Sequence, residues 1–352
     1  MSTETAAAVE VPASGMNGRP YVLRIEDLVV DYPSRDGDLR AVDGVSLEVR
    51  EGETIGVVGE SGCGKSTVAL SVLGLADQNG AVTRRGRVVV GDEDILARPP
   101  AKRAALRGSV ASLVFQEPMT AFNPLLTVGE QLCETLVAHH KKLSRADARI
   151  RAAELLDRVG VPDPQRRIGQ YPSEFSGGML QRAMIAVAIA NGPRLIVADE
   201  PATALDVTVQ AQIIELFREL TTQTNAGLVV VTHDLGIVAE LVDRVVVMYA
   251  GKVVETADVG TLFTEPRHPY TAALLASRPR LGLAFRKERL RSIPGAPVNA
   301  TDITSGCAFR PRCTTWDGRD ICTRQAPPLQ QIGELRSAAC HFHQELTIVE
   351  DR

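Results

Sequence analysis

The sequence predicts an α/β protein whose strands form a mostly parallel sheet, followed by a second and smaller unit. Two short runs, 195–199 and 228–234, are almost entirely apolar and flank a helical pattern at 207–224. Strands of this kind are buried on both faces, because helices cover the sheet. Beyond about residue 278 the periodicity fades, and Pro, Arg and Cys become frequent. A chain of 352 residues is long enough for two such units.

The composition excludes several classes of protein. With 39 Lys+Arg and 43 Asp+Glu the net charge is −4, which gives no electrostatic reason to expect nucleic acid as a partner. No apolar run approaches the ~18 residues that cross a bilayer, and the first residues lack the basic start and apolar block of a signal peptide. We therefore expect an intracellular, reducing location, where the six cysteines are free thiols or metal ligands rather than disulfides.

The elements follow one another in a consistent order. Residues 1–20 are rich in Ala, Ser, Gly and Pro without periodicity, which predicts a disordered tail. From Tyr21 the runs YVLRIEDLVVDY, VSLEV and TIGVVG predict strands, beginning with an antiparallel sheet that leads into the parallel one. Ser144 and Asp147 predict the cap of one helix. Helical patterns follow Gly64 and recur at 127–140, 144–159, 178–190 and 207–224, and a further buried strand is expected at 244–251.

The sharpest motif is GESGCGKS, which follows the strand TIGVV and precedes a helix. Glycines at this spacing let backbone N–H groups surround a phosphate, Lys65 reaches the β- and γ-phosphates, and the Ser66 hydroxyl binds Mg²⁺. The structural alternative is a glycine-rich turn without a ligand. We assign the following residues, called here the phosphate loop, to nucleotide binding: Gly59, Glu60, Ser61, Gly62, Cys63, Gly64, Lys65, Ser66 and Thr67.

A second motif, LIVADE, places two carboxylates at the end of an apolar strand. Asp199 can hold Mg²⁺ opposite Ser66, while Glu200 can orient and deprotonate a water that attacks the nucleotide. Taken alone, acids at a strand end are often only a solvated terminus. Together with the phosphate loop they predict hydrolysis of a nucleoside triphosphate.

A third motif, Ser176-Gly177-Gly178 followed by Gln181, opens a helix and offers a second anion site made of backbone donors. Its structural alternative is an ordinary N-cap. One chain rarely needs two such sites for one nucleotide, which indicates a dimer.

Together these motifs, with Gln116, Ala204-Leu205-Asp206 and His233 in the same order, resemble the ATP-binding cassette ATPases over about 21–275. The resemblance implies a P-loop cassette at 21–278, with a RecA-like parallel core, an antiparallel β subdomain and a helical subdomain at about 117–190. It also implies that two cassettes pack head to tail, and that each ATP, with its Mg²⁺, lies between the phosphate loop of one and Ser-Gly-Gly of the other.

The resemblance implies further roles. Gln116 would contact Mg²⁺ and the attacking water, and His233 would contact the γ-phosphate, so both join Glu200 as catalytic residues. Asp206 would lie in a loop that couples the two sites, and Tyr32 would stack on adenine, a contact worth ~1 kcal/mol. Each residue also has a structural alternative: a loop glutamine, a core histidine, a packed tyrosine.

Further stretches narrow the family. QEPMTAFNPLLTVGEQL, LDVTVQAQI, PRHPYTAALLAS and SIPGAPVN are similar to the ATP-binding subunits of dipeptide and oligopeptide importers, whose relatives import nickel or glutathione. This implies a second cassette, as a copy or paralogue, two membrane permease subunits and an extracytoplasmic solute-binding protein, at the cytoplasmic face of the membrane and without nucleic acid. The alternatives are an importer of nickel or another small solute, and a soluble, non-transport cassette ATPase.

The expected extension, 279–345, is rich in cysteine. Cys307, Cys313, Cys322 and Cys340 leave gaps of 5, 8 and 17 residues, which favours a Cys₄ site. Structural zinc usually shows closely paired cysteines, which are absent, whereas a 4Fe–4S cluster tolerates wider gaps. The resemblance also implies an iron–sulfur cluster; zinc and metal-free thiols remain as alternatives, and His341 and His343 could replace a thiol.

Overall fold

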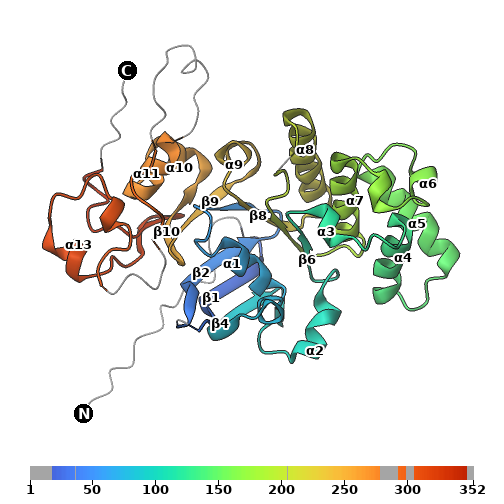
Figure 1. Ribbon diagram of the computed structural model, residues 1–352, viewed down its shortest axis with the longest axis horizontal. Helices are drawn as coiled ribbons and strands as arrows, with labels where there is room; N and C mark the ends of the chain where they lie inside the picture. The colour runs from blue at the N-terminus through green and yellow to red at the C-terminus, as the bar shows by residue number, and fades with distance from the viewer. Residues whose placement is uncertain (1–17, 36, 204, 278–291, 299–304, 347–352) are drawn as a thin grey trace.

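The computed structural model describes residues 18–35, 37–203, 205–277, 292–298 and 305–346. Most of the expected disordered tail, and the first part of the expected extension, lie outside the described residues. The described chain forms two sheets with helices around them, and a group of helices stands at one end (Figure 1).

The larger sheet has eight strands in the order β11-β12-β10-β9-β3-β8-β7-β6. The five strands from β9 to β6 pair in parallel, which confirms the predicted parallel core. Their apolar runs are buried throughout, because helices cover this sheet and leave no solvated face. The strands are β3 (Thr54–Val58), β6 (Ala111–Val114), β7 (Leu195–Asp199), β8 (Gly227–Thr232), β9 (Arg244–Tyr249), β10 (Lys252–Asp258), β11 (Gln330–Gly333) and β12 (Arg336–Ala338).

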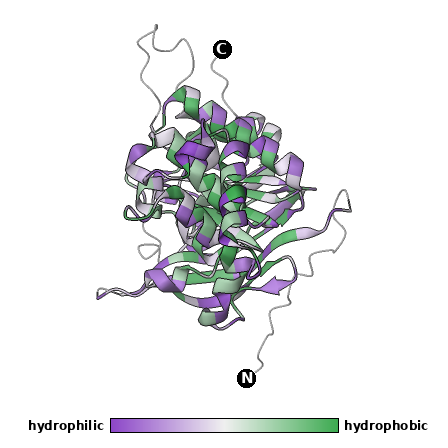
Figure 2. Cartoon of the chain, turned by 90° about the vertical axis from the view of Figure 1, so that its right-hand side faces the viewer, coloured by the Kyte–Doolittle hydropathy of each residue, from purple (hydrophilic) through white to green (hydrophobic). Residues whose placement is uncertain are grey.

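The smaller sheet is antiparallel, in the order β2-β1-β4-β5. Its strands are β1 (Tyr21–Tyr32), β2 (Leu39–Arg50), β4 (Val82–Val90) and β5 (Glu93–Asp94). Apolar residues from one face pack with α1 (Lys65–Val72) and with strands of the larger sheet in a shared core. Figure 2 shows hydrophobic residues concentrated on the strands of the interior and hydrophilic ones toward the outside.

The helical region comprises α3 (Pro118–Ala121), α4 (Val128–His139), α5 (Arg145–Arg158), α6 (Pro164–Arg167) and α7 (Gly177–Ile189). The helices expected at 127–140, 144–159 and 178–190 are confirmed to within one residue at each end. The predicted cap of α5 is also confirmed: the Asp147 N–H donates to the Ser144 hydroxyl at 3.1 Å. These helices bury their apolar faces against one another and against the parallel sheet.

The larger sheet is flanked by α8 (Val207–Thr224), α9 (Leu235–Leu241), α10 (Val259–Thr264) and α11 (Pro269–Ala276). Residues 305–346 then form the 3₁₀ turn η5 (Arg310–Arg312), α13 (Asp320–Arg324) and the strands β11 and β12. This part differs from the separate, loop-rich unit that we expected, because β12 pairs with β10 and continues the main sheet. Within the described part of the chain, no helix is both long and apolar enough to cross a membrane.

Candidate functional site

The phosphate loop lies between the buried strand β3 and the start of α1. Gly64 caps α1 with φ +103°, and a Cβ there would come within 2.2 Å of the Ala41 carbonyl oxygen, so only glycine fits. Lys65 is 6% exposed, and its ammonium donates to the carbonyl oxygens of Gly59 (2.8 Å) and Glu60 (2.9 Å). The lysine thus folds back over the loop that a phosphate would fill.

Tyr32 adjoins the loop, whereas Cys63 is one of the loop's own residues. Tyr32 ends β1, and its hydroxyl lies 3.4 Å from the Thr67 hydroxyl at the start of α1. Cys63 is buried beside Lys65, and burial raises the pKa of its thiol, so the thiol is neutral at pH 7. Tyr32 is therefore at the loop's edge, while Cys63 is a buried residue of the loop itself.

Glu200, directly after β7, is the centre of a cluster of polar side chains. Its carboxylate accepts hydrogen bonds from the Gln116 amide, the Thr203 hydroxyl and His233 Nδ1, each at 2.9 Å. Burial alone would raise the pKa of Glu200, but the hydrogen bonds from His233 and Thr203 outweigh burial and lower it. The structure thus brings the three predicted catalytic residues together, with the carboxylate ionised. The backbone of Glu200 has φ +49°, a left-handed conformation that costs free energy in a non-glycine residue and is typical of functional sites.

Asp199 lies beside this cluster and is coupled to the phosphate loop. Burial raises the pKa of Asp199, although a hydrogen bond with Ser66 lowers it in part. Its buried Oδ1 has no hydrogen-bond partner among the described residues. A carboxylate oxygen left without a donor, next to a hydroxyl, is the kind of hard oxygen ligand that Mg²⁺ binds, so these side chains fit the predicted metal.

The Ser176-Gly177-Gly178 motif is not at the phosphate loop of its own chain. Figure 1 shows α7, which the motif opens, apart from α1 and on the other side of β8 and β6. The Ser176 hydroxyl caps α7 by accepting from Met179 N at 3.3 Å. A Cβ on Gly178 would lie 2.7 Å from Val209 of α8, whereas one on Gly177 would find its nearest neighbour 3.9 Å away.

The two other residues predicted for this region have structural contacts. Gln181 is buried on α7, and its Nε2 has no partner among the described residues. Asp206 caps α8, since its Oδ1 accepts from Val209 N at 2.9 Å. Neither residue joins the Glu200 cluster, and the role predicted for each stays a prediction.

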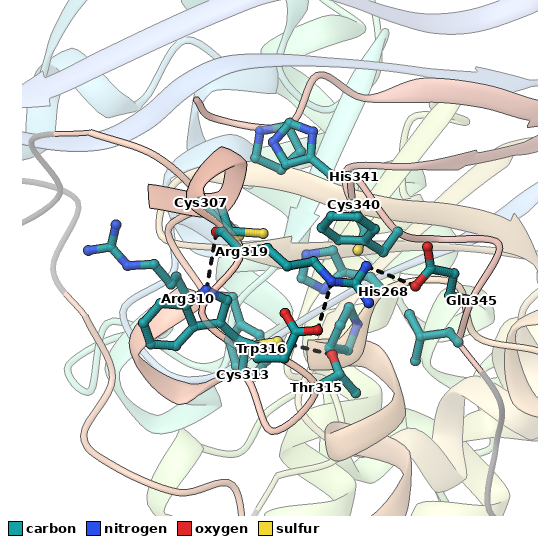
Figure 3. Close-up of a pocket in the computed structure, with 17 residues that line it drawn as sticks. His268, Cys307, Arg310, Cys313, Thr315, Trp316, Arg319, Cys340, His341 and Glu345 are labelled. Atoms are coloured by element: carbon teal, nitrogen blue, oxygen red, sulfur yellow. Dashed lines mark hydrogen bonds and ion pairs between the residues drawn. The ribbon is translucent and has the colours of Figure 1, made fainter. Parts of the chain in front are cut away.

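The four C-terminal cysteines line one cavity of about 250 Å³ (Figure 3). Burial raises the pKa of Cys340 to about 11, and burial also raises the pKa values of Cys307 and Cys322. Among the described residues, no group of three or more metal-ligating side chains is close enough to hold a single metal ion. Of the alternative ligands, His341 lines the same cavity and His343 does not; nitrogens of His341 and His343 contact backbone carbonyl oxygens at 3.0 and 3.1 Å. The Cys₄ metal site therefore stays a prediction.

Sequence reasoning missed two contacts of the site. Thr203 follows Glu200 by three residues, and a hydroxyl at that spacing within a turn is a signal that could have been found. Arg312 forms an ion pair with Glu60 of the phosphate loop across 252 positions of sequence, and no local pattern indicates such a pair.

A glycine-rich loop that can hold phosphates, a buried carboxylate for Mg²⁺ and an ionised glutamate beside them define a nucleoside-triphosphate-hydrolysing cassette. Comparison with known families narrows this class. The chain matches the ABC transporter family over residues 42–203, and the C-terminal region of oligopeptide/dipeptide transporters over residues 254–322.

Individual relatives of this chain point to the same family as the two family matches. The dipeptide transport ATP-binding protein DppD of Escherichia coli (strain K12) is 44% identical over 91% of this chain and 96% of its own length. DppD of Bacillus subtilis (strain 168) is 46% identical over 87% and 90%, and the oligopeptide transport ATP-binding protein OppD of Salmonella typhimurium is 42% identical over 96% and 97%. The chain belongs to the ABC transporter ATP-binding proteins, in the branch that carries the oligopeptide/dipeptide transporter C-terminal region.

Solved structures share the cassette fold. The ATP-binding cassette MJ0796, determined as a dimer in a post-hydrolysis state bound to ADP and Pi, has a TM-score of 0.61 and 27% identity, covering 67% of this chain and 98% of its own. A second dimeric structure of MJ0796 has a TM-score of 0.60 and 28% identity over the same shares. The predicted cassette fold is thus confirmed for the part that aligns.

Proposed function

We propose that this chain is the ATP-hydrolysing subunit of a membrane importer for dipeptides and oligopeptides. The main observation that supports ATPase activity is the cluster in which Gln116 and His233 each form a 2.9 Å hydrogen bond with the Glu200 carboxylate. The peptide class is supported by relatives that are 42–46% identical over most of the chain and are named for dipeptide and oligopeptide transport.

In this proposal ATP binds over the phosphate loop. The backbone N–H groups from Gly59 to Thr67 surround the β-phosphate, and Lys65 exchanges the carbonyl oxygens of Gly59 and Glu60 for the β- and γ-phosphates. Tyr32, next to Thr67, stacks on adenine. Ser66, Asp199 and the Gln116 side-chain oxygen would hold Mg²⁺, which would neutralise phosphate charge.

Hydrolysis depends on Glu200. Its carboxylate is ionised and accepts the proton of the attacking water as the water approaches the γ-phosphate. Gln116 orients the same water through its amide. His233 holds the carboxylate through Nδ1. As the imidazolium, which carries a proton on both ring nitrogens, it would also donate from Nε2 to the γ-phosphate oxygens.

The second half of each site comes from a partner cassette, either a copy or a paralogue. Ser176, Gly177, Gly178 and Gln181 would contact the ATP held by the partner's phosphate loop, and Asp206 would couple the two sites. The separation of α7 from α1 within one chain supports this arrangement (Figure 1), as does the dimeric form of the structural neighbour. Two permease subunits and a solute-binding protein complete the importer, with this chain at the cytoplasmic face of the membrane.

We also propose a 4Fe–4S cluster in the cavity of the four cysteines. Cys307, Cys313, Cys322 and Cys340 line one cavity (Figure 3). A cubane takes one thiolate on each iron, whereas zinc draws four sulfurs to about 2.3 Å from one ion. The sequence gaps of 5, 8 and 17 residues, together with the shared cavity, support the cluster over zinc. When bound, the cluster would fix the loops of the extension.

ATP binding and hydrolysis by the purified complex with its permease subunits test the ATPase. Lys65→Ala should abolish both, because the loop loses the cation that faces the phosphates. Lys252→Ala is the matched control, since Lys252 is a half-exposed lysine whose ammonium pairs with Asp43. Retention of ATP hydrolysis in Lys65→Ala, or equal loss in the control, contradicts the assignment.

A further inference from the structure

Arg312, in the turn η5 of the C-terminal extension, reaches the phosphate loop. Its guanidinium makes a bidentate ion pair with the Glu60 carboxylate: Nη1 donates to Oε2 at 2.6 Å, and Nη2 donates to Oε1 at 2.9 Å. Glu60 is the second residue of the loop. The extension therefore touches the element that the proposed function assigns to ATP.

This ion pair differs from an ordinary surface pair. Arg312 is 4% exposed, and its Nε donates to the Pro294 carbonyl oxygen at 2.8 Å. Its Nη1 also donates to the Tyr249 hydroxyl at 3.4 Å, and Phe309 of the same segment packs edge-on against the Tyr249 ring. Exposed ion pairs contribute little to stability, because both side chains must be ordered to form them. Here the contacts with Pro294 and Tyr249 already fix the guanidinium in the position from which it binds Glu60.

The Glu60 backbone is held at the same time by two other contacts. Its N–H donates to the Tyr270 hydroxyl of α11 at 2.8 Å, and its carbonyl oxygen accepts from Lys65 Nζ at 2.9 Å. One loop residue therefore joins α11, the extension and the phosphate-binding lysine. Because phosphate binding by such loops depends on where their backbone N–H groups point, the fixing of Glu60 orders the loop before ATP arrives.

We propose that Arg312 is a positioning residue of the nucleotide site: it acts through Glu60 to hold the phosphate loop in the conformation that accepts the phosphates of ATP. The inference rests on the proposed nucleotide site. Through the ion pair between Arg312 and Glu60, the C-terminal extension is a structural part of the nucleotide site. Two backbone hydrogen bonds close the turn that carries Arg312: the Arg310 N–H donates to the Cys307 carbonyl oxygen, and the Cys313 N–H donates to the Arg310 carbonyl oxygen. The conformation of the cysteine segment therefore affects the phosphate loop through the Arg312 side chain.

The test measures the ATP dissociation constant, kcat and KM of the full chain in its importer complex. Arg312→Met removes the charge but keeps most of the volume. We expect the dissociation constant for ATP to rise about tenfold, as for the loss of a charge-assisted hydrogen bond, with kcat at saturating ATP within about twofold because the Glu200 cluster is untouched. Arg310→Met in the same turn is the matched control, since Arg310 donates to the Thr323 carbonyl oxygen, and it should leave the ATP affinity unchanged.

Further variants separate positioning from stability. Glu60→Gln removes the same charge pair from the cassette side, so it reports on the pair even if Arg312→Met fails to fold. The double variant should bind ATP no more weakly than the weaker single variant, and Arg312→Lys should recover part of the affinity, because lysine keeps the charge without the fork.

The inference is overturned if folded Arg312→Met binds ATP like the wild type, if Glu60→Gln does so, or if the two effects add. A wild-type complex that binds no ATP would instead overturn the proposed function, and the inference with it. A tenfold loss confined to KM and the dissociation constant, absent in Arg310→Met, supports the inference.

Discussion

Replacing Glu200 by Gln tests the chemistry of the site. The substitution keeps the shape of the side chain but removes its charge and its capacity to take a proton. In the wild type both carboxylate oxygens accept hydrogen bonds, from Gln116 and Thr203 on one and from His233 on the other. An amide retains one acceptor oxygen and turns an NH₂ group toward a donor, so the water-positioning cluster loses a contact as well as its base.

Loss of a general base lowers turnover by about 10²–10⁴-fold, and we expect Glu200→Gln to fall in that range. ATP binding should persist, because Lys65 and the loop glycines remain, and the paired cassettes should accumulate closed around unhydrolysed ATP. Single-turnover phosphate release measures the chemical step, and gel filtration with ATP measures closure. Glu215→Gln, an exposed glutamate of α8 that pairs with Arg218, is the control. If Glu200→Gln released phosphate at the wild-type rate, the role of Glu200 as the general base would be refuted.

Three other predictions test separate parts of the account. Gly177→Asp has room within its own chain and should leave ATP binding to the isolated chain intact while abolishing hydrolysis by the paired cassettes; full hydrolysis would exclude a composite site. Cys322→Ser should bleach a brown, anaerobically purified protein that holds about four irons and expose the extension to protease; colourless wild-type protein with one zinc ion would refute the cluster, and metal-free protein with an equally protected extension would remove the metal site. Because hydrogen bonds lower the pKa of Glu200, kcat should not fall through this group until the pH drops below the ordinary range of a glutamate side chain, around 4.3; an acid limb centred above that range that persists in His233→Gln would contradict this assignment.

The parallel core and the position of Glu200 could be predicted because their causes are local. The run LIVAD at 195–199 is apolar enough to be a buried strand, and Glu200 follows it directly. Helices such as α5 show both a periodic face and a capping serine, Ser144, so their ends were predictable to within a residue. The roles of Gln116 and His233 beside Glu200 were implied only by the family resemblance; in the structure the two residues follow β6 and β8, the strands on either side of β7.

Other features have causes that the local sequence does not contain. Strand β4, VTRRGRVVV, was missed because its first half is charged and exposed; its arginines pair with acids on other segments, as Arg84 does with Asp31. The short strands β11 and β12 exist because β10 offers an unpaired edge. The ion pair of Arg312 with Glu60 depends on how the extension packs against Tyr249, and tertiary packing of that kind leaves no periodic signal.

We propose that ATP hydrolysis by this chain drives peptide uptake, and a transport assay measures this coupling most directly. The complex would be reconstituted in proteoliposomes with its permease subunits and solute-binding protein, with MgATP on the side of this chain and a radiolabelled dipeptide or ⁶³Ni²⁺ on the other. We expect the dipeptide to accumulate against its gradient with the wild type, to remain at background with Glu200→Gln, and to accumulate normally with Glu215→Gln. Accumulation of nickel but not of peptide, or peptide uptake that persists in Glu200→Gln, would contradict the claim.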